Sequence, residues 1–283
     1  MESDGEFIMA VKYLSGNRLW GTNAERLAMT VGGSAYFDGN DYVDVGGSAT
    51  DFNFLTTTFS LACWMKLTPL QDAIIFDNCD ANASSVGVAF VLEHTGGGNY
   101  QITAKLNRGT GVGYDVVTSA VWGDTDWQHI VVTYDGTTMK LYRNDTEVGS
   151  GSLTSSSSDQ SYVPRIGWCA NGNKNEIDGY IDDFLLTDDV LTGAEITALA
   201  GGASVDSVTS ITEARQELHY TFDTNFNDSS GNGYNGTATG ATISTSVFKT
   251  AIYPNLPNGS VFITSDTNVH YMWNGTDTWN EVA

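Results

Sequence analysis

The chain has 283 residues, and its 34 Asp and Glu against 12 Lys and Arg give a net charge of −22 at pH 7. A surface this negative repels phosphate backbones and anionic lipid headgroups, so we expect no nucleic-acid partner and no membrane insertion. Hydrophobic residues make up 41% of the sequence, which is enough for a packed core and excludes wholesale disorder. The 31 glycines imply many turns and favour a loop-rich, all-β protein.

We predict that the first 32 residues form a leader, or assembly arm, ahead of the main domain. They begin with an acidic stretch that lacks the basic start and apolar run of a secretion signal. Within the leader, residues 23–29 have the composition of one short helix. No segment of the chain approaches the roughly 18 continuous apolar residues of a membrane span.

Between residues 35 and 186 the sequence is dominated by short β-strand patterns. In residues 59–67 alternate positions are apolar, so one face of that strand would be buried. Hairpin-type dipeptides separate the strands, and Asp135-Gly136 is the strongest of them. Many short strands at regular spacing predict a β-sandwich or barrel. The predicted strands are residues 36–45 (around a turn), 59–67, 73–76, 86–93, 100–106, 114–117, 128–134, 139–143, 163–168 and 179–186.

A short amphipathic helix is predicted over residues 191–200, because Thr192 and Glu195 have the spacing of a capping box. Residues 203–253 follow as a linker that contains one strand, at 218–222, and a turn-dense loop. Residues 254–283 predict a small three-stranded meander. Such a meander has too little core to stand alone, so we expect it to pack on the main domain or on a neighbouring chain. Its predicted strands are residues 260–264, 269–273 and 278–282.

Seven segments resemble a known fold by their order along the chain. They are YFDGNDYV at 36–43, FSLACWMK at 59–66, WQHIVVTYDG at 127–136, MKLYRN at 139–144, RIG at 165–167, GYIDDF at 179–184 and VLTGAEI at 190–196. Together they resemble the laminin-G-like, concanavalin-A-like jelly roll of the pentraxin and lectin type, over residues 33–202. The resemblance implies an all-β antiparallel β-sandwich with two curved sheets, a concave face usable for glycans and often a structural Ca2+ ion.

Residues 217–236 resemble the segment that normally opens a laminin-G-like domain, yet here they follow the domain, which lacks such a segment at its own start. Two interpretations stay open. The segment is the remnant of a second, degenerate unit, or it supplies the missing edge strand, either to its own sandwich or to that of the next protomer. In the last case Leu218, Tyr220 and Phe222 would be assembly residues.

The carboxylates suggest one metal site. A Ca2+ ion needs six to eight oxygen ligands, taken from carboxylates and from the backbone carbonyls of tight turns. Asp38 lies in a turn with Gly39, and Asp182 and Asp183 lie in a strand that we predict to be half-buried. The resemblance implies that the Asp38-Gly39 turn approaches Asp182, so these residues are the candidates to share the ion. Buried like charges without a cation would destabilise the fold.

We do not expect an enzyme. Laminarinase-type glucanases of this fold place three carboxylates on one strand as Glu-x-Asp-x-x-Glu, and the nearest match here, Glu176-Ile-Asp178-Gly-Tyr-Ile181, has isoleucine at the third position. Aromatic side chains beside amides can instead stack on sugar rings. The candidate glycan-binding residues are Trp168, with Asn171 and Asn173 in the loop after it.

Both ends of the chain, in residues 12–27 and 256–282, are similar to virion structural proteins of viruses that infect marine microbes. A virion would carry an adhesion domain to the outside of cells without a secretion signal. The first hypothesis is a non-enzymatic structural or adhesion protein on a virion surface (capsid decoration, tail or fibre), with itself, other structural subunits or cell-surface glycans as partners. The alternatives are a carbohydrate-binding module of a secreted microbial protein and a divergent glycoside hydrolase or lyase. A Cys79–Cys169 disulfide and three free thiols both stay open.

Overall fold

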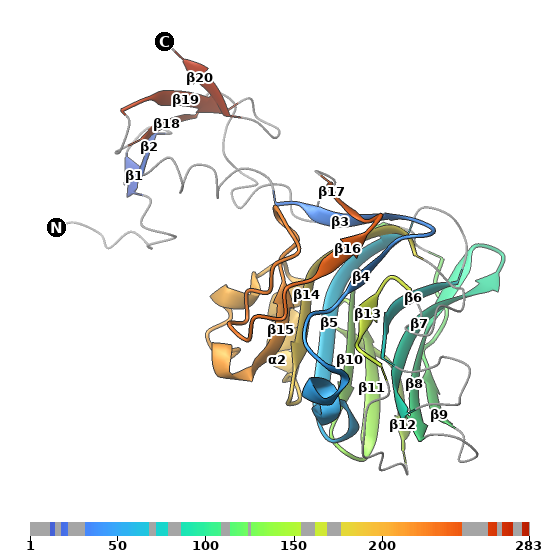
Figure 1. The fold of residues 1–283 in the computed structure, drawn as a ribbon. Coiled ribbons are helices and arrows are strands. Elements are labelled where there is room, and N and C mark those ends of the chain that lie inside the picture. Colours follow the sequence, from blue (N-terminus) through green and yellow to red (C-terminus); the bar gives the residue numbers. More distant parts are fainter. Residues whose placement is uncertain are drawn as a thin grey trace. The chain divides into compact units, whose positions relative to one another are not determined.

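The computed structural model describes residues 12–14, 18–21, 32–67, 72–78, 86–108, 114–123, 126–153, 162–168, 177–244, 260–264, 268–273 and 279–282. The chain forms two compact units. The sandwich unit is Ser34–Phe248, and the terminal unit combines the two ends of the chain, Met1–Gly33 and Lys249–Ala283. Figure 1 shows the labelled elements of both units.

The sandwich unit contains two antiparallel sheets, as predicted. Sheet I has the strand order β12-β11-β10-β5-β14-β3-β17, with β15 also paired to β14, and sheet II has the order β16-β4-β13-β6-β7-β8-β9. The strands of sheet I are β3 (Ser34–Asp38), β5 (Phe59–Leu67), β10 (Gln128–Tyr134), β11 (Thr138–Arg143), β12 (Thr146–Ser152), β14 (Asp178–Thr187), β15 (Gln216–Tyr220) and β17 (Thr242–Ser244). The strands of sheet II are β4 (Tyr42–Asp44), β6 (Ala73–Asp77), β7 (Val86–Gly96), β8 (Asn99–Arg108), β9 (Tyr114–Thr118), β13 (Arg165–Ile166) and β16 (Thr237–Thr239). A 3-10 helix, η1 (Ala49–Thr56), connects β4 to β5.

Alternation within the strands builds the core between the two sheets. In β5, Leu61 and Met65 belong to the main core, whereas Ala62 belongs to a separate cluster on the outer face of sheet I. Stacked phenylalanines join the sheets, because the rings of Phe76 from sheet II and Phe184 from sheet I lie 5.8 Å apart. The main core is therefore a single apolar layer between the sheets.

The described part of the chain contains one cysteine, Cys63, and it is a free, buried thiol. Burial raises the pKa of this thiol to about 12, which keeps it protonated and unreactive. Cys79 and Cys169, for which a disulfide stayed open, lie outside the described residues.

Helix α2 (Gly193–Ala200) covers one end of the outer face of sheet I (Figure 1). The predicted capping box is confirmed. The N–H of Thr192 donates to Glu195 Oε2 at 2.7 Å, and the N–H of Glu195 donates to Thr192 Oγ1 at 3.3 Å. No helix in the described ranges is long and apolar enough to cross a membrane. The outer cluster under the helix consists of Ala62, Val131, Leu185, Leu191, Ile196, Leu199, Val205 and Ile211.

An ion-pair network holds α2 to the segment that leads into β15. After the short turns η2 (Val205–Ser207) and η3 (Glu213–Arg215), the Arg215 guanidinium donates to Asp189 Oδ2 at 2.6 Å and to the carboxylate of Glu195. The Glu195 side chain is only 3% exposed. Burial alone would raise the pKa of Glu195, but hydrogen bonds from Arg215 and Thr192 lower it to about 2. This carboxylate is therefore charged inside the protein and depends on Arg215.

Strand β15 is an edge strand of its own sandwich. It pairs with the second half of β14, where Phe184 lies opposite Tyr220, while β3 pairs with the first half. Strand β16 pairs with β4, and β17 pairs with β3. Residues 216–244 thus complete both sheets, so their interpretation as the remnant of a second unit is wrong. The sandwich extends to Phe248, beyond the boundary at residue 202 that the sequence suggested.

The first and last described strands of the sandwich unit lie side by side. Strand β17 pairs with β3, the first strand of the unit, with Ser244 opposite Ser34. Adjacent chain ends of this kind are common in compact domains.

The terminal unit is a sheet made from both ends of the chain, in the order β1-β2-β18-β19-β20. Strand β18 from the tail lies parallel to β2 from the leader, with Val261 opposite Arg18. The three predicted strands of the meander are confirmed, and they form one sheet with the leader strands β1 and β2. The candidate helix at residues 23–29 lies outside the described residues. The bounds are β1 (Lys12–Leu14), β2 (Arg18–Gly21), β18 (Val261–Thr264), β19 (His270–Trp273) and β20 (Trp279–Val282).

Candidate functional site

Trp168, the aromatic residue predicted to bind glycans, lies just after β13 on the outer face of sheet II. It packs against Ile74, Ala89 and Val91, a small apolar cluster separate from the main core. Ala89 and Val91 alternate along β7 with side chains of the main core, which fixes this cluster on the outer side of the sheet. Trp168 is half-buried as a residue, and its indole Nε1 is a buried atom.

Tyr42 contacts Trp168, and Arg165 and Asp44 continue this group of side chains beside Tyr42. The ring of Tyr42 meets that of Trp168 edge to face, with the centroids 5.1 Å apart and an interplanar angle of 86°. Arg165 lies opposite Asp44 in the β13–β4 pair, and its Nε donates to Asp44 Oδ1 at 2.6 Å. The guanidinium carbon of Arg165 also lies 4.4 Å from the centroid of the Tyr42 ring. We name Tyr42, Asp44, Arg165 and Trp168 the sheet II cluster.

The sheet II cluster has the chemistry of a sugar-binding surface. Aromatic rings offer flat apolar faces to the C–H groups of a pyranose, and neighbouring charged groups form hydrogen bonds with its hydroxyls. The sequence singled out Trp168 as a candidate but not Tyr42, Asp44 or Arg165, which the structure places in the same cluster. Alternation in residues 42–44 places Tyr42 and Asp44 on one face, but the pairing with β13 is not visible in the sequence. The other two predicted glycan-binding residues, Asn171 and Asn173, lie outside the described residues.

The predicted metal ligands are not brought together. Asp38 ends β3 and lies opposite Asp178 of β14. Asp182 is four positions further along β14, which is roughly 13 Å at the rise of a strand. The Asp182 carboxylate accepts the N–H of Asp183 at 2.9 Å, and Gly39 donates its own N–H to a backbone carbonyl. The shared site expected at Asp38 and Asp182 therefore does not form.

A β-bulge interrupts strand β14 at Asp182 and Asp183. The register between β14 and β5 shifts between Asp182 and Leu185, and Asp183 has a left-handed φ of 45°. Within the residues that the structure describes, no group of three or more His, Cys, Asp or Glu side chains has the geometry to hold a metal ion. The proposed ligand set does not fit a structural Ca2+ ion, and the ion has no part in the function proposed below.

The three predicted assembly residues lie in the core of their own sandwich. Leu218, Tyr220 and Phe222 are each 0% exposed and pack in the main cluster between the sheets. Of the interpretations left open by the sequence, the structure matches the one in which this segment supplies an edge strand to its own sandwich. A contact of these side chains with a second chain would require β15 to leave sheet I.

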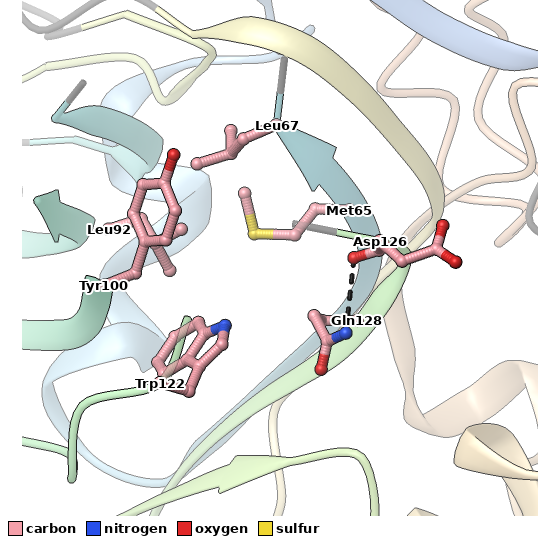
Figure 2. A pocket seen from close by; sticks show the side chains of 7 residues that line it. All are labelled: Met65, Leu67, Leu92, Tyr100, Trp122, Asp126 and Gln128. Atoms are coloured by element: carbon pink, nitrogen blue, oxygen red, sulfur yellow. Dashed lines mark hydrogen bonds between the residues drawn. The ribbon is translucent and has the colours of Figure 1, made fainter. Parts of the chain in front are cut away.

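A hollow of about 240 Å3, part of it open to solvent, lies at one end of the sandwich (Figure 2). Figure 2 shows the Asp126 carboxylate directed away from the hollow, while the Gln128 amide donates to the Asp126 backbone carbonyl. Apart from Asp126, no lining side chain is more than 8% exposed. The hollow is therefore a gap in the packing between the sheets and not a surface for a ligand. It is lined by Met65, Leu67, Leu92, Tyr100, Trp122, Asp126 and Gln128.

The sandwich has the fold of a lectin-like class of protein. The chain matches the model of the concanavalin A-like lectin/glucanases superfamily over residues 37–197, which is more than half of its 283 residues. It therefore belongs to this superfamily, and the predicted laminin-G-like jelly roll is confirmed. Among curated proteins, none matches the sequence.

Solved structures support the same fold. A candidate carbohydrate-binding protein from Bacteroides ovatus is similar over 76% of this chain and 60% of its own length, with a TM-score of 0.52 and 16% identity. The heptameric SAP-like pentraxin from Limulus polyphemus is similar over 75% of this chain and 94% of its own, with a TM-score of 0.51 and 12% identity. At such identities the likeness establishes the fold alone.

Proposed function

We propose that this chain is a non-enzymatic adhesion protein that binds glycans through the sheet II cluster. The observation that carries the proposal is the edge-to-face pair of Tyr42 and Trp168 beside the Arg165–Asp44 ion pair. Membership in a superfamily of lectins and glucanases, and the likeness to a candidate carbohydrate-binding protein, support it.

The geometry of the cluster favours binding over hydrolysis. Glycoside hydrolysis needs two carboxylates that flank the scissile bond. The carboxylate of this cluster, Asp44, is instead engaged by Arg165. The stacked guanidinium and the packed rings are already held in place, so few side-chain rotamers are lost when a sugar binds. Such a surface orients a glycan and leaves its bonds intact.

The direct test is the substitution Trp168→Ala. We expect it to weaken the binding of a glycan found on a glycan array by about tenfold, because one stacking contact contributes about 1.4 kcal/mol. The measurement is isothermal titration of the glycan that gives the strongest array signal. The matched control is Val116→Ala, which removes a 42% exposed apolar side chain from strand β9 at the far edge of the same sheet. Equal affinities of all three proteins would contradict the proposal.

We also propose that the protein acts outside the cell, on the surface of a virion, with the terminal unit as the point of attachment. The support is the similarity of both ends of the chain to virion structural proteins, together with the β2–β18 pairing that joins these two ends in one sheet. The alternative, a carbohydrate-binding module of a secreted microbial protein, needs no such attachment. Self-assembly distinguishes the two.

Electron microscopy of the purified full chain is expected to show rings or ordered polymers. The substitution Phe262→Asp, at a fully buried position of β18, should abolish assembly and leave the melting of the sandwich unit unchanged. The control Val121→Asp, at a 55% exposed position of the sandwich, should assemble normally. A full chain that stays monomeric and still binds its glycan would favour the secreted module.

A further inference from the structure

Three aromatic side chains form a row across the outer face of sheet I, at the end that α2 leaves uncovered. Tyr36 comes from β3, Tyr180 from β14, and Trp127 directly precedes β10. The ring centroids of Tyr36 and Tyr180 are 5.0 Å apart, and those of Tyr180 and Trp127 are 6.1 Å apart. All three residues are half-buried, so part of each remains exposed to solvent. We name these three residues the aromatic row.

Strand register explains why the three rings meet. Tyr36 lies directly opposite Tyr180 in the β3–β14 pair, and Tyr180 lies opposite Lys66 in the β14–β5 pair. The two central strands approach closely here, because a Cβ on Gly179 would lie 2.2 Å from the carbonyl oxygen of Lys66. Trp127 directly follows Asp126, the ion-pair partner of Lys66, and its contact with Tyr180 closes the row. The aromatic row is therefore built on central strands of a rigid sheet, which fixes the positions of its rings.

Charged groups accompany the rings on both sides. Lys66 Nζ lies 3.3 Å from Asp126 Oδ1, next to Trp127. At the other end, Asp38 and Asp178 lie opposite each other beside Tyr36. Burial, followed by the nearby charge of Asp178, raises the pKa of Tyr36, which agrees with carboxylates that face this ring. The row thus has hydrogen-bonding groups along its length and carries more negative than positive charge.

We infer that the aromatic row is a second glycan-binding site, on the opposite face of the sandwich from the sheet II cluster, and that its ligand is an uncharged polysaccharide. A continuous row of tilted rings offers stacking surface to consecutive sugar units, and carboxylates accept hydrogen bonds from their hydroxyls. The same carboxylates, on a chain of net charge −22, repel sulfated, sialylated or uronic chains. The site shares only the class of ligand with the proposed function and does not depend on Trp168.

A protein partner fits this surface less well than a glycan. The centre of a protein–protein interface is depleted in charged residues. Here Lys66, Asp126 and Asp178 lie next to the rings, and the side chain of Asp126 is 74% exposed. Burying hydrated charges of this kind under another protein costs desolvation free energy, whereas the hydroxyls of a sugar chain form hydrogen bonds with them.

The test is affinity electrophoresis of the full chain in gels that contain hydroxyethyl cellulose, galactomannan, laminarin or soluble starch as neutral probes, and alginate or carrageenan as anionic ones. We expect at least one neutral probe to retard the unaltered chain. Tyr180→Ala and Trp127→Ala should each lose about tenfold or more in affinity for that probe. Tyr180→Phe, which keeps the ring, should bind it within about twofold of the unaltered chain. The Trp168→Ala variant should bind that probe as before.

Each other outcome overturns the inference. These outcomes are no retardation by any neutral probe, retardation only by anionic probes, or unchanged affinity in Tyr180→Ala and Trp127→Ala chains whose melting temperatures are close to that of the unaltered chain. A loss in Trp168→Ala alone would support the sheet II cluster and remove the aromatic row. Two separate row variants guard against one of them failing to fold.

Discussion

Replacing Arg215 by methionine is expected to destabilise the sandwich unit by about 3 kcal/mol. The guanidinium of Arg215 binds the carboxylates of Glu195 and Asp189, and Glu195 is only 3% exposed. Methionine keeps most of the apolar stem but leaves the Glu195 charge buried without its counter-ion. The same contact ties α2 to η3, so the loss should reach the start of β15 and the edge of sheet I.

Urea unfolding at neutral pH gives this difference, with Lys140→Met as the matched control. Lys140 lies 3.0 Å from Glu147, but both side chains are at least 40% exposed, so solvent screens this pair and it contributes little to stability. An acid titration adds a second signature. The pKa of Glu195 is about 2 against an ordinary 4.5, so its stabilising effect is complete above about pH 4.5 and is lost as the pH falls towards 2. That loss should be smaller in Arg215→Met. Similar unfolding energies for the two methionine variants would contradict the expectation.

Local patterns in the sequence were sufficient for most individual elements of the sandwich. The strand predicted at 59–67 is β5 (Phe59–Leu67), because alternate apolar side chains fix both its period and its buried face. The start of α2 was predictable because the Thr192–Glu195 capping box is a local contact. By contrast β12 (Thr146–Ser152), rich in Gly, Ser and Thr, was missed. It is held by backbone pairing to β11 at the edge of sheet I and shows no apolar alternation.

Partner and register are properties that the sequence pattern does not contain. Alternation states which face a side chain takes, but it does not state which residue lies opposite. The family resemblance implied that Asp38 lies near Asp182, whereas the β3–β14 register places it opposite Asp178. The meeting of Tyr36 with Tyr180 depends on the same register and was not predicted. The parallel pairing of β2 with β18 joins the two ends of the chain, and the predicted strands of the tail gave no sign of it.

The second large loss of stability is expected from a substitution in the loop after β15. Asp228 accepts hydrogen bonds from the backbone N–H groups of His219, Ser230 and Tyr234 at 3.1, 2.9 and 3.0 Å, and from the Ser230 hydroxyl at 2.8 Å. One carboxylate thus orients the turn-dense loop that the sequence predicted and fastens it to β15. Asp228→Ala removes the acceptor for all of these donors, and we expect it to lower the free energy of unfolding by about 2–3 kcal/mol.

Hydrogen exchange measures where this loss falls. In Asp228→Ala the amides of Leu218 and His219 in β15 should exchange faster than those of β10 at the centre of sheet I, since an edge strand that loses its loop opens locally before the sandwich unfolds. The control Asp145→Ala removes a turn carboxylate whose one side-chain hydrogen bond, from Thr146, is 3.3 Å long and exposed, and should change stability by less than about 0.5 kcal/mol. Unaltered protection of β15 in Asp228→Ala would mean that the strand is held by its pairing with β14 alone. Strand β15 would then need no loop to stay in its own sheet.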